Sequence, residues 1–257
     1  MAGFFDFMAN PTRFQAIAKP LRPFCLALAV MCFAYGLYLS LFASPADYQQ
    51  GEAVRIMYVH VPAAWIGLSS YLGLGICALF YLVWRHPLGD IAARAIAPIG
   101  AGFAGITLVT GSLWGYPIWG TWWVWDARLT SMLVLFFFFI GYIALANGFE
   151  RRERGARMAA ILALVGCVNL PIVKFSVDWW HTLHQPASIL RSGGVAIDSS
   201  MLWPLMVMFA GFQAFFIWIV LHRMGWILAE RRLEARLHQS KRAHQKPSEE
   251  QNRKLAP

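Results

Sequence analysis

Two residue types in this sequence, histidine and tryptophan, are placed where they could bind a ligand together. His60 stands near the start of one apolar stretch, and His184 follows the pair Trp179-Trp180 after another. Between them, five of the twelve tryptophans fall within twelve residues: Trp114, Trp119, Trp122, Trp123 and Trp125. Neutral imidazoles are common metal ligands, and indole rings stack on flat apolar molecules. We therefore expect His60 and His184 to bind a metal beside a tryptophan-rich surface.

Haem fits this combination better than zinc. Zinc sites usually include Cys or carboxylate ligands in a closed set of four, and no carboxylate near these histidines has that motif spacing. Haem iron takes two axial ligands from opposite faces of a wide apolar ring. Its propionates need cations, and Arg55 and Arg128 lie close in sequence to His60 and the tryptophan cluster. Asp126 is expected to orient an imidazole N–H or the loop backbone.

The tryptophan cluster itself is predicted to be an irregular loop over residues 114–130. Gly115, Pro117 and Gly120 interrupt this stretch, and such residues disfavour a continuous helix. The alternative is an ordinary aromatic belt at the membrane surface. A belt would distribute its tryptophans over all helix ends, whereas seven of the twelve lie in this stretch and in the pair before His184. The clustering favours a binding surface.

The composition shows which kind of protein must position these residues. Hydrophobic residues make up 58% of the 257 residues and charged residues only 14%. A soluble domain carries about 25% charged residues. The net charge of +9 does not indicate nucleic-acid binding, because the charges are scarce and clustered. The sequence predicts an integral membrane protein.

Six charge-poor stretches are candidates for membrane-spanning helices, since a span needs roughly 20 apolar residues. The fold class is therefore all-α, a polytopic bundle of six transmembrane helices. The charges bounding each stretch place the spans at 23–46, 56–84, 95–125, 129–149, 158–173 and 199–222. No interior charged residue is expected in any of them.

The basic residues predict the orientation of the chain. Of the 22 lysines and arginines, 18 lie in the two terminal segments and the second and fourth connections, and four (Arg55, Arg128, Lys174 and Arg191) lie on the other side. The positive-inside rule then places both termini in the cytoplasm. We expect a cytoplasmic segment at 1–22, a membrane domain at 23–225 and a basic, partly disordered tail at 226–257.

Several other activities are less compatible with the sequence. The four cysteines all fall within spans and form no CxxC pair, so thiol chemistry is not expected. A transmembrane b-type cytochrome would carry its paired histidines within spans, yet it remains the main alternative. An enzyme acting on a lipid-linked substrate would need a nucleophile and base or paired carboxylates. A transporter with a polar site at the midplane would need charged residues inside the spans.

The residues also resemble a known family. The stretch 119–130, WGTWWVWDARLT, resembles the signature of the WWD superfamily of haem-handling proteins. Four further segments resemble one family in it, the six-span CcmC haem exporters of bacterial cytochrome c maturation: 46–51 (ADYQQG), 58–64 (YVHVPAA), 168–172 (VNLPI) and 179–185 (WWHTLHQ). The resemblance extends from about residue 43 through the sixth span.

The resemblance implies a haem-handling protein of the bacterial inner membrane rather than an enzyme. Such proteins hold haem b transiently on the periplasmic face, between two axial histidines that match His60 and His184, with the WWD loop beneath the porphyrin. His181 leaves open which histidine of its segment binds iron. The family passes haem to the chaperone CcmE and works with the ATPase CcmA, with CcmB and with CcmD. The sequence contains no nucleotide-binding P-loop.

Overall fold

A computed structural model describes residues 10–185, 189 and 194–255, with side chains described as far as residue 240. Within these residues the chain is helical and contains no β-strand. The α-helices are α2 (Pro11–Tyr38), α3 (Met57–Trp84), α4 (Pro87–Trp119), α5 (Ala127–Asn147), α6 (Arg152–Cys167), α7 (Asn169–Trp179) and α8 (Ser199–Leu255). A π-helical turn, η1 (Leu39–Ala43), and a 3-10 turn, η2 (Glu52–Ile56), connect α2 to α3. The predicted segment 1–22 lies partly outside the described residues, and Arg191 lies wholly outside them.

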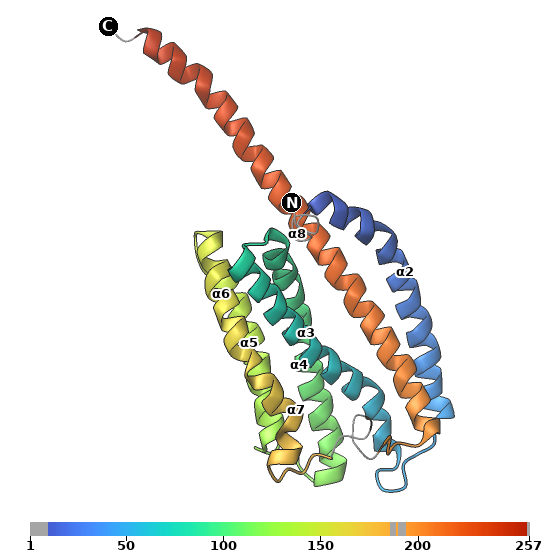
Figure 1. The fold of residues 1–257 in the computed structure, drawn as a ribbon. Helices are drawn as coiled ribbons and strands as arrows, with labels where there is room; N and C mark the ends of the chain where they lie inside the picture. The colour runs from blue at the N-terminus through green and yellow to red at the C-terminus, as the bar shows by residue number, and fades with distance from the viewer. Residues whose placement is uncertain (1–9, 186–188, 190–193, 256–257) are drawn as a thin grey trace.

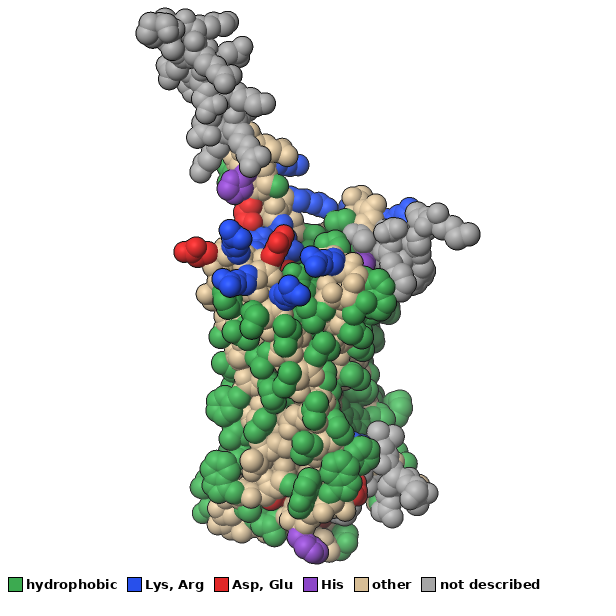
Figure 2. All heavy atoms as spheres, turned by 60° about the vertical axis from the view of Figure 1, so that its left-hand side comes forward, with side chains coloured by type: hydrophobic (Ala, Val, Ile, Leu, Met, Phe, Trp, Pro, Cys, Tyr) green, Lys and Arg blue, Asp and Glu red, His purple; other side chains and the backbone are tan. Residues whose placement is uncertain are grey.

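The helices lie side by side in one elongated bundle, from which the end of α8 projects beside the start of α2 (Figure 1). The prediction of six spans is confirmed, since six helical stretches are long and apolar enough to cross a membrane: Pro11–Ala43, Glu52–Trp84, Pro87–Trp119, Ala127–Asn147, Arg152–Trp179 and Ser199–Ser240. Hydrophobic side chains cover the middle of the bundle, while arginines and lysines gather at the end from which α8 projects (Figure 2). We call this the basic end and the opposite one the tryptophan end.

The helices extend further than the charge boundaries predicted. Asn10 caps α2, because its side chain accepts a hydrogen bond from the Thr12 amide (2.9 Å), and Pro11 occupies the first turn, where its missing N–H costs nothing. At the basic end, α4 begins at Pro87 and so includes Asp90 and Arg94. The helix therefore extends past the charged residue that bounded the predicted span, and Asp90 and Arg94 lie near its start.

The buried carboxylate of Asp90 is stabilised by two arginines. It accepts a hydrogen bond from Arg94 Nε (2.9 Å), one turn along α4, and it also pairs with Arg231 of α8. A buried carboxylate needs such partners, since an unpaired charge out of water is costly. The pairing holds the projecting part of α8 against α4.

The fifth span is divided at Val168 into α6 and α7. Pro171 has no N–H to bond to the carbonyl of Cys167, so the helix cannot continue regularly through this point. The Asn169 side chain instead donates a hydrogen bond from Nδ2 to the Ser131 carbonyl of α5 (2.8 Å). This bond satisfies a buried polar group and sets the direction in which α7 approaches the tryptophan end.

Small residues bring the central helices close together, as is common in membrane bundles. Gly100 of α4 lies against Phe139 of α5 and Ser70 of α3, and a Cβ at Gly100 would overlap with both of these side chains. Gly166 of α6 makes the same kind of approach to Tyr71 of α3. The core cluster therefore joins α3, α4, α5 and α6.

Candidate functional site

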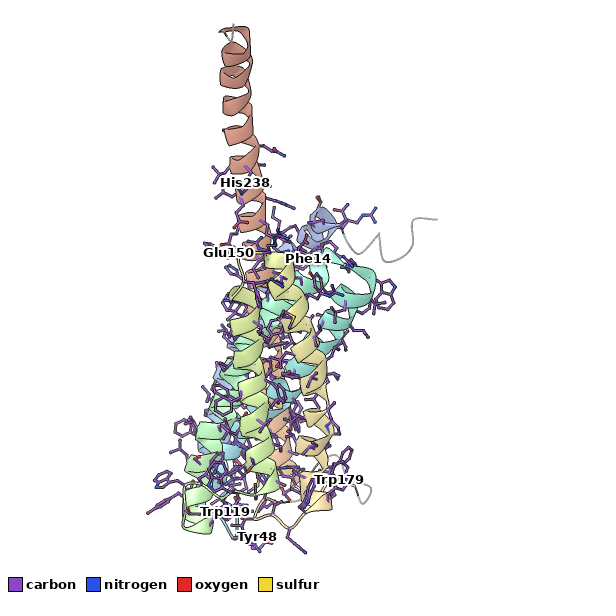
Figure 3. The ribbon with its side chains drawn as sticks, turned by 90° about the vertical axis from the view of Figure 1, so that its left-hand side faces the viewer. Phe14, Tyr48, Trp119, Glu150, Trp179 and His238 are labelled. Atoms are coloured by element: carbon purple, nitrogen blue, oxygen red, sulfur yellow. The ribbon has the colours of Figure 1, made fainter. Side chains whose placement is uncertain are left out.

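The segments carrying the predicted site residues converge at the tryptophan end. Tyr48, Trp119 and Trp179 lie at this end, far from Phe14 and Glu150 at the other (Figure 3). The start of α3 supplies His60, the end of α4 supplies Trp114 and Trp119, and the segment after α7 supplies His184.

The first half of the predicted tryptophan loop is helical, which corrects the prediction of an irregular segment from residue 114. Helix α4 continues through Gly115 and Pro117 and ends at Gly120, whose φ of 73° is in the left-handed region that glycine adopts readily. Pro117 is tolerated because it lies in the last turn and removes one hydrogen bond there. The irregular segment is only 120–126, and Asp126 Oδ1 then caps α5 by accepting a hydrogen bond from the Leu129 amide (2.8 Å).

His60 and His184 lie next to each other although 124 positions separate them in sequence. Their ring centroids are 6.3 Å apart, with 29° between the ring planes. Each ring also meets the edge of one indole. Trp114 contacts His60 (5.6 Å between centroids, 75°), and Trp119 contacts His184 (5.9 Å, 64°).

Thr110 determines which nitrogen of His60 is available to a ligand. The Thr110 hydroxyl donates its proton to the Ile106 carbonyl of α4 (Oγ1···O 2.6 Å), so its oxygen accepts at the 3.0 Å contact with His60 Nδ1. His60 is then protonated at Nδ1 in the neutral ring, and the lone pair lies on Nε2. This is the arrangement found for metal-binding histidines, where the second nitrogen donates to a fixed acceptor.

His184 is held as a neutral imidazole. Burial, assisted by the positive charge of Arg128 and by the neighbouring His60, lowers the pKa of His184 to about 3. Its Nδ1 is buried and has no hydrogen-bond partner among the described residues. The backbone around it is ordered by Thr182, whose hydroxyl accepts a hydrogen bond from the His184 amide (3.1 Å). A neutral ring with an unengaged nitrogen is the form that binds a metal ion.

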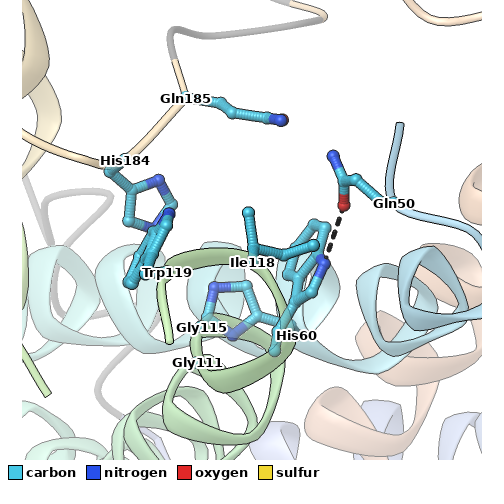
Figure 4. A pocket seen from close by; sticks show the side chains of 9 residues that line it. Gln50, His60, Gly111, Gly115, Ile118, Trp119, His184 and Gln185 are labelled. Carbon is cyan, nitrogen blue, oxygen red and sulfur yellow. Dashed lines mark hydrogen bonds between the residues drawn. The ribbon is translucent and has the colours of Figure 1, made fainter. Parts of the chain in front are cut away.

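A small cavity of about 50 Å³ lies between the two histidines (Figure 4). Its lining comes from four segments, namely the turn before α3, α3 itself, α4 and the segment after α7: Gln50, His60, Gly111, Trp114, Gly115, Ile118, Trp119, His184 and Gln185. Gln50 reaches across from the turn that precedes α3, and its Oε1 accepts a hydrogen bond from Trp114 Nε1 (2.9 Å). Asp47 orders that turn by accepting bonds from the amides of Gln49 and Gln50 (2.9 and 2.8 Å).

The other predicted tryptophans are not part of the cavity lining. Trp122 stacks on Tyr116 (4.3 Å between centroids, 15°), and Trp123 meets Trp125 edge-on (5.5 Å). Trp179 contacts Trp180 (5.7 Å), and both are about half exposed. These rings add to the apolar surface of the tryptophan end.

The two predicted arginines are placed differently from each other. Arg55 pairs with Glu52 and donates a hydrogen bond from Nη1 to the Ser40 carbonyl (2.6 Å), so it braces the connection between α2 and α3. Arg128 donates to Ser176 Oγ (3.3 Å) and to the Lys174 carbonyl (3.1 Å) of α7. The positive charge of Arg128 contributes to the lowered pKa of His184. Arg128 is the better placed of the two to attract an anion near the histidines.

Sequence reasoning missed several lining residues. Gly111, Gly115 and Ile118 recur at helical spacing with Trp114 on one face of α4, a pattern hidden by the expectation of a loop. Gln50 and Gln185 are in the segments that carried the family resemblance, but their polar side chains had no assigned role. His181 is exposed and lies outside the cavity lining.

Comparisons with known proteins agree on one family. The family model described as "heme exporter protein C" (CcmC) matches residues 4–239. Proteins named heme exporter protein C are similar to this chain. The one from Bradyrhizobium diazoefficiens is 51% identical over 228 residues (89% of this chain, 86% of the relative), and that of Escherichia coli K12 is 44% identical over 217 residues (84% and 87%). The protein of that name from Paracoccus denitrificans is 39% identical over 236 residues (91% and 98%).

Proposed function

Because this chain belongs to the heme exporter protein C (CcmC) family, which has a role in haem export for cytochrome c maturation, we propose that it holds haem at the tryptophan end and delivers it to the chaperone CcmE. The axial ligands are His60 and His184. Haem b is the cargo, bound transiently and then passed on, and the chain acts as a handling protein rather than an enzyme.

The observation that carries this proposal is the spacing of the two histidines. A metal–imidazole bond is about 2 Å long, so two imidazoles on opposite sides of one iron have their centres about 6 Å apart. The centroids of His60 and His184 are 6.3 Å apart. The unengaged Nδ1 of His184 and the Thr110 contact of His60 supply the remaining requirements, a free nitrogen and a fixed orientation.

Haem entry requires this site to open. Ligand sites usually enclose about 300–1,000 Å³, whereas the cavity between the histidines has about 50 Å³. Gln50 and Gln185 come from irregular segments on either side, so these are the elements that separate to admit the porphyrin. The indoles of Trp114 and Trp119 then provide flat apolar contacts, and Trp122, Trp123, Trp125, Trp179 and Trp180 surround them.

Arg128 is the proposed partner for a propionate, because its charge acts on the histidine site and a guanidinium binds a carboxylate well. Arg55 supports the site indirectly, through Glu52 and the Ser40 carbonyl. Asp126 serves by capping α5 and so ends the segment that carries the WWD tryptophans.

The basic end is proposed to face the cytoplasm, with both termini, and the tryptophan end to face the periplasm across the bacterial inner membrane. The distribution of lysines and arginines supports this orientation. CcmA, CcmB and CcmD are the proposed partners in the export complex.

Optical spectra of the purified protein with added haem test the axial assignment. We expect a low-spin, two-histidine spectrum for the wild type and its loss or conversion to high spin in His60→Ala and in His184→Ala. His181→Ala is the matched control and should leave the spectrum unchanged, since His181 is exposed and outside the cavity lining. An unchanged Soret band in both ligand variants would refute the assignment.

A further inference from the structure

A second and larger cavity lies at the basic end, between α4, α5 and α8. Its volume is about 730 Å³, which is within the range of about 300–1,000 Å³ typical of ligand sites. Helix α4 packs against both α5 and α8 and provides the floor through Ala97 and Pro98. The walls are the last turns of α5 and the part of α8 from His222 to Arg231.

Polar contacts hold these three helices in place around the cavity. Arg94 of α4 donates a hydrogen bond from Nη1 to Asn147 Oδ1 of α5 (3.2 Å), while Asp90 binds Arg231 of α8. Arg152, the first residue of α6, pairs with Glu234 of α8 (3.0 Å). The cavity is therefore bordered on its basic side by residues that bind one another across the helices.

The lining combines apolar residues with charged ones. Tyr142, Ile143 and Ile227 continue the apolar floor of α4. The charged residues of the lining are four arginines (Arg94, Arg152, Arg223 and Arg231) and two glutamates (Glu150 and Glu230). Arg94, Arg152 and Arg231 have protein partners, whereas Arg223 makes no hydrogen bond or ion pair with the described residues. Arg223 is thus the cation available to an incoming anion.

We propose that this cavity binds an anionic phospholipid. Its phosphate would lie at Arg223, and an acyl chain would lie along the apolar lining residues of α4, α5 and α8. Basic pockets between transmembrane helices on the cytoplasmic side are suited to lipid head groups. A phosphate group satisfies a guanidinium through paired hydrogen bonds. Trp226, an exposed residue of the lining, is of a type favoured at head-group level. His222 is the one histidine in the lining, so the cavity lacks the paired ligands of the haem site.

Native mass spectrometry of the full-length protein tests this proposal. The protein is reconstituted in nanodiscs of phosphatidylcholine with phosphatidylglycerol, extracted, and measured for retained lipid. We expect selective retention of phosphatidylglycerol, reduced about fivefold by Arg223→Gln, since one basic residue contributes about that factor to anionic lipid binding. Arg157→Gln removes the same charge from the same end, outside the cavity, and should retain lipid like the wild type. Unchanged haem spectra establish that both variants are folded.

Four results would overturn the proposal. Equal retention of the two lipids would show that the head group is not recognised, and an equal loss in Arg157→Gln would show attraction by the whole basic end. Displacement of the lipid by inorganic phosphate alone would identify an ion site without an acyl contribution. Displacement by haem that depends on Arg223 would assign the cavity to the porphyrin instead.

Discussion

The substitution Gly111→Ala tests how closely the proposed haem site is packed around His60. Gly111 lies on the face of α4 that meets the start of α3, and a Cβ built there is 3.0 Å from His60 Cε1 and 3.6 Å from Nδ1. Ordinary van der Waals contacts of a Cβ are 3.4–4 Å. The imidazole must therefore move away by a few tenths of an ångström, which approaches the tolerance of about 0.5 Å for a functional ligand.

The expected result is weaker haem binding by a protein that is still folded and is destabilised by at most about 2.5 kcal/mol. Disturbing the orientation of a metal ligand costs about 10–100-fold in affinity, and we expect roughly tenfold here. The helix gains about 0.5–1 kcal/mol from replacing glycine by alanine, against an overpacking cost of about 1–3 kcal/mol. Haem titration followed at the Soret band measures the affinity, and thermal unfolding without haem measures the stability.

Gly102→Ala is the matched control on the same helix. No atom lies within 4 Å of a Cβ built at Gly102, so the same chemical change there should leave the affinity for haem unaltered. Wild-type affinity and a low-spin spectrum in Gly111→Ala would refute the close packing of His60. Equal losses in the two variants would point to a general effect of alanine in α4.

Two further substitutions test the polar contacts at opposite ends of the bundle. Thr110→Val removes the acceptor of the His60 N–H and should lower haem affinity about 10–100-fold. Thr110→Ser keeps a hydroxyl acceptor and should bind haem like the wild type. Identical haem titrations for the two variants would contradict the proposed orientation of His60. Asp90→Asn leaves two arginines without their carboxylate and should destabilise the protein by about 3–5 kcal/mol in thermal or denaturant unfolding. Glu234→Gln, which disrupts a half-exposed pair, should cost about 0–1 kcal/mol, and an equally small effect of Asp90→Asn would show that Asp90 is not a buried anchor.

The number of spans was predictable because hydropathy is a local property. Each apolar stretch must form its backbone hydrogen bonds within itself in a bilayer, so length and composition are enough to indicate a helix. The ends were less predictable. Capping by Asn10 and pairing of Asp90 with Arg231 let helices continue past charges that the sequence pattern placed outside the membrane.

The tryptophan cluster shows a second limit of local reasoning. Gly115 and Pro117 indicated a loop, but both are compatible with the final turns of α4. Gly115 in fact lets the Trp119 ring lie against the helix, since a Cβ there would be 2.8 Å from Trp119 Cε3. Helical continuation places Gly111, Trp114 and Ile118 on one face and so forms the lining that sequence reasoning did not identify.

The sequence by itself determined the membrane environment, the six helices, the family and the residue types that suit a haem ligand, because these depend on composition, short-range spacing and recognisable motifs. Only the tertiary structure decided that His60 and His184 share one small cavity, that Gln50 helps to line it and that Thr110 contacts His60 Nδ1. The tertiary structure also showed that Arg55 binds groups in the connection between α2 and α3, whereas Arg128 binds groups of α7. Such proximity depends on how α3, α4 and α7 pack. That packing is set by small residues, a proline break and a buried asparagine bond distributed over distant parts of the chain.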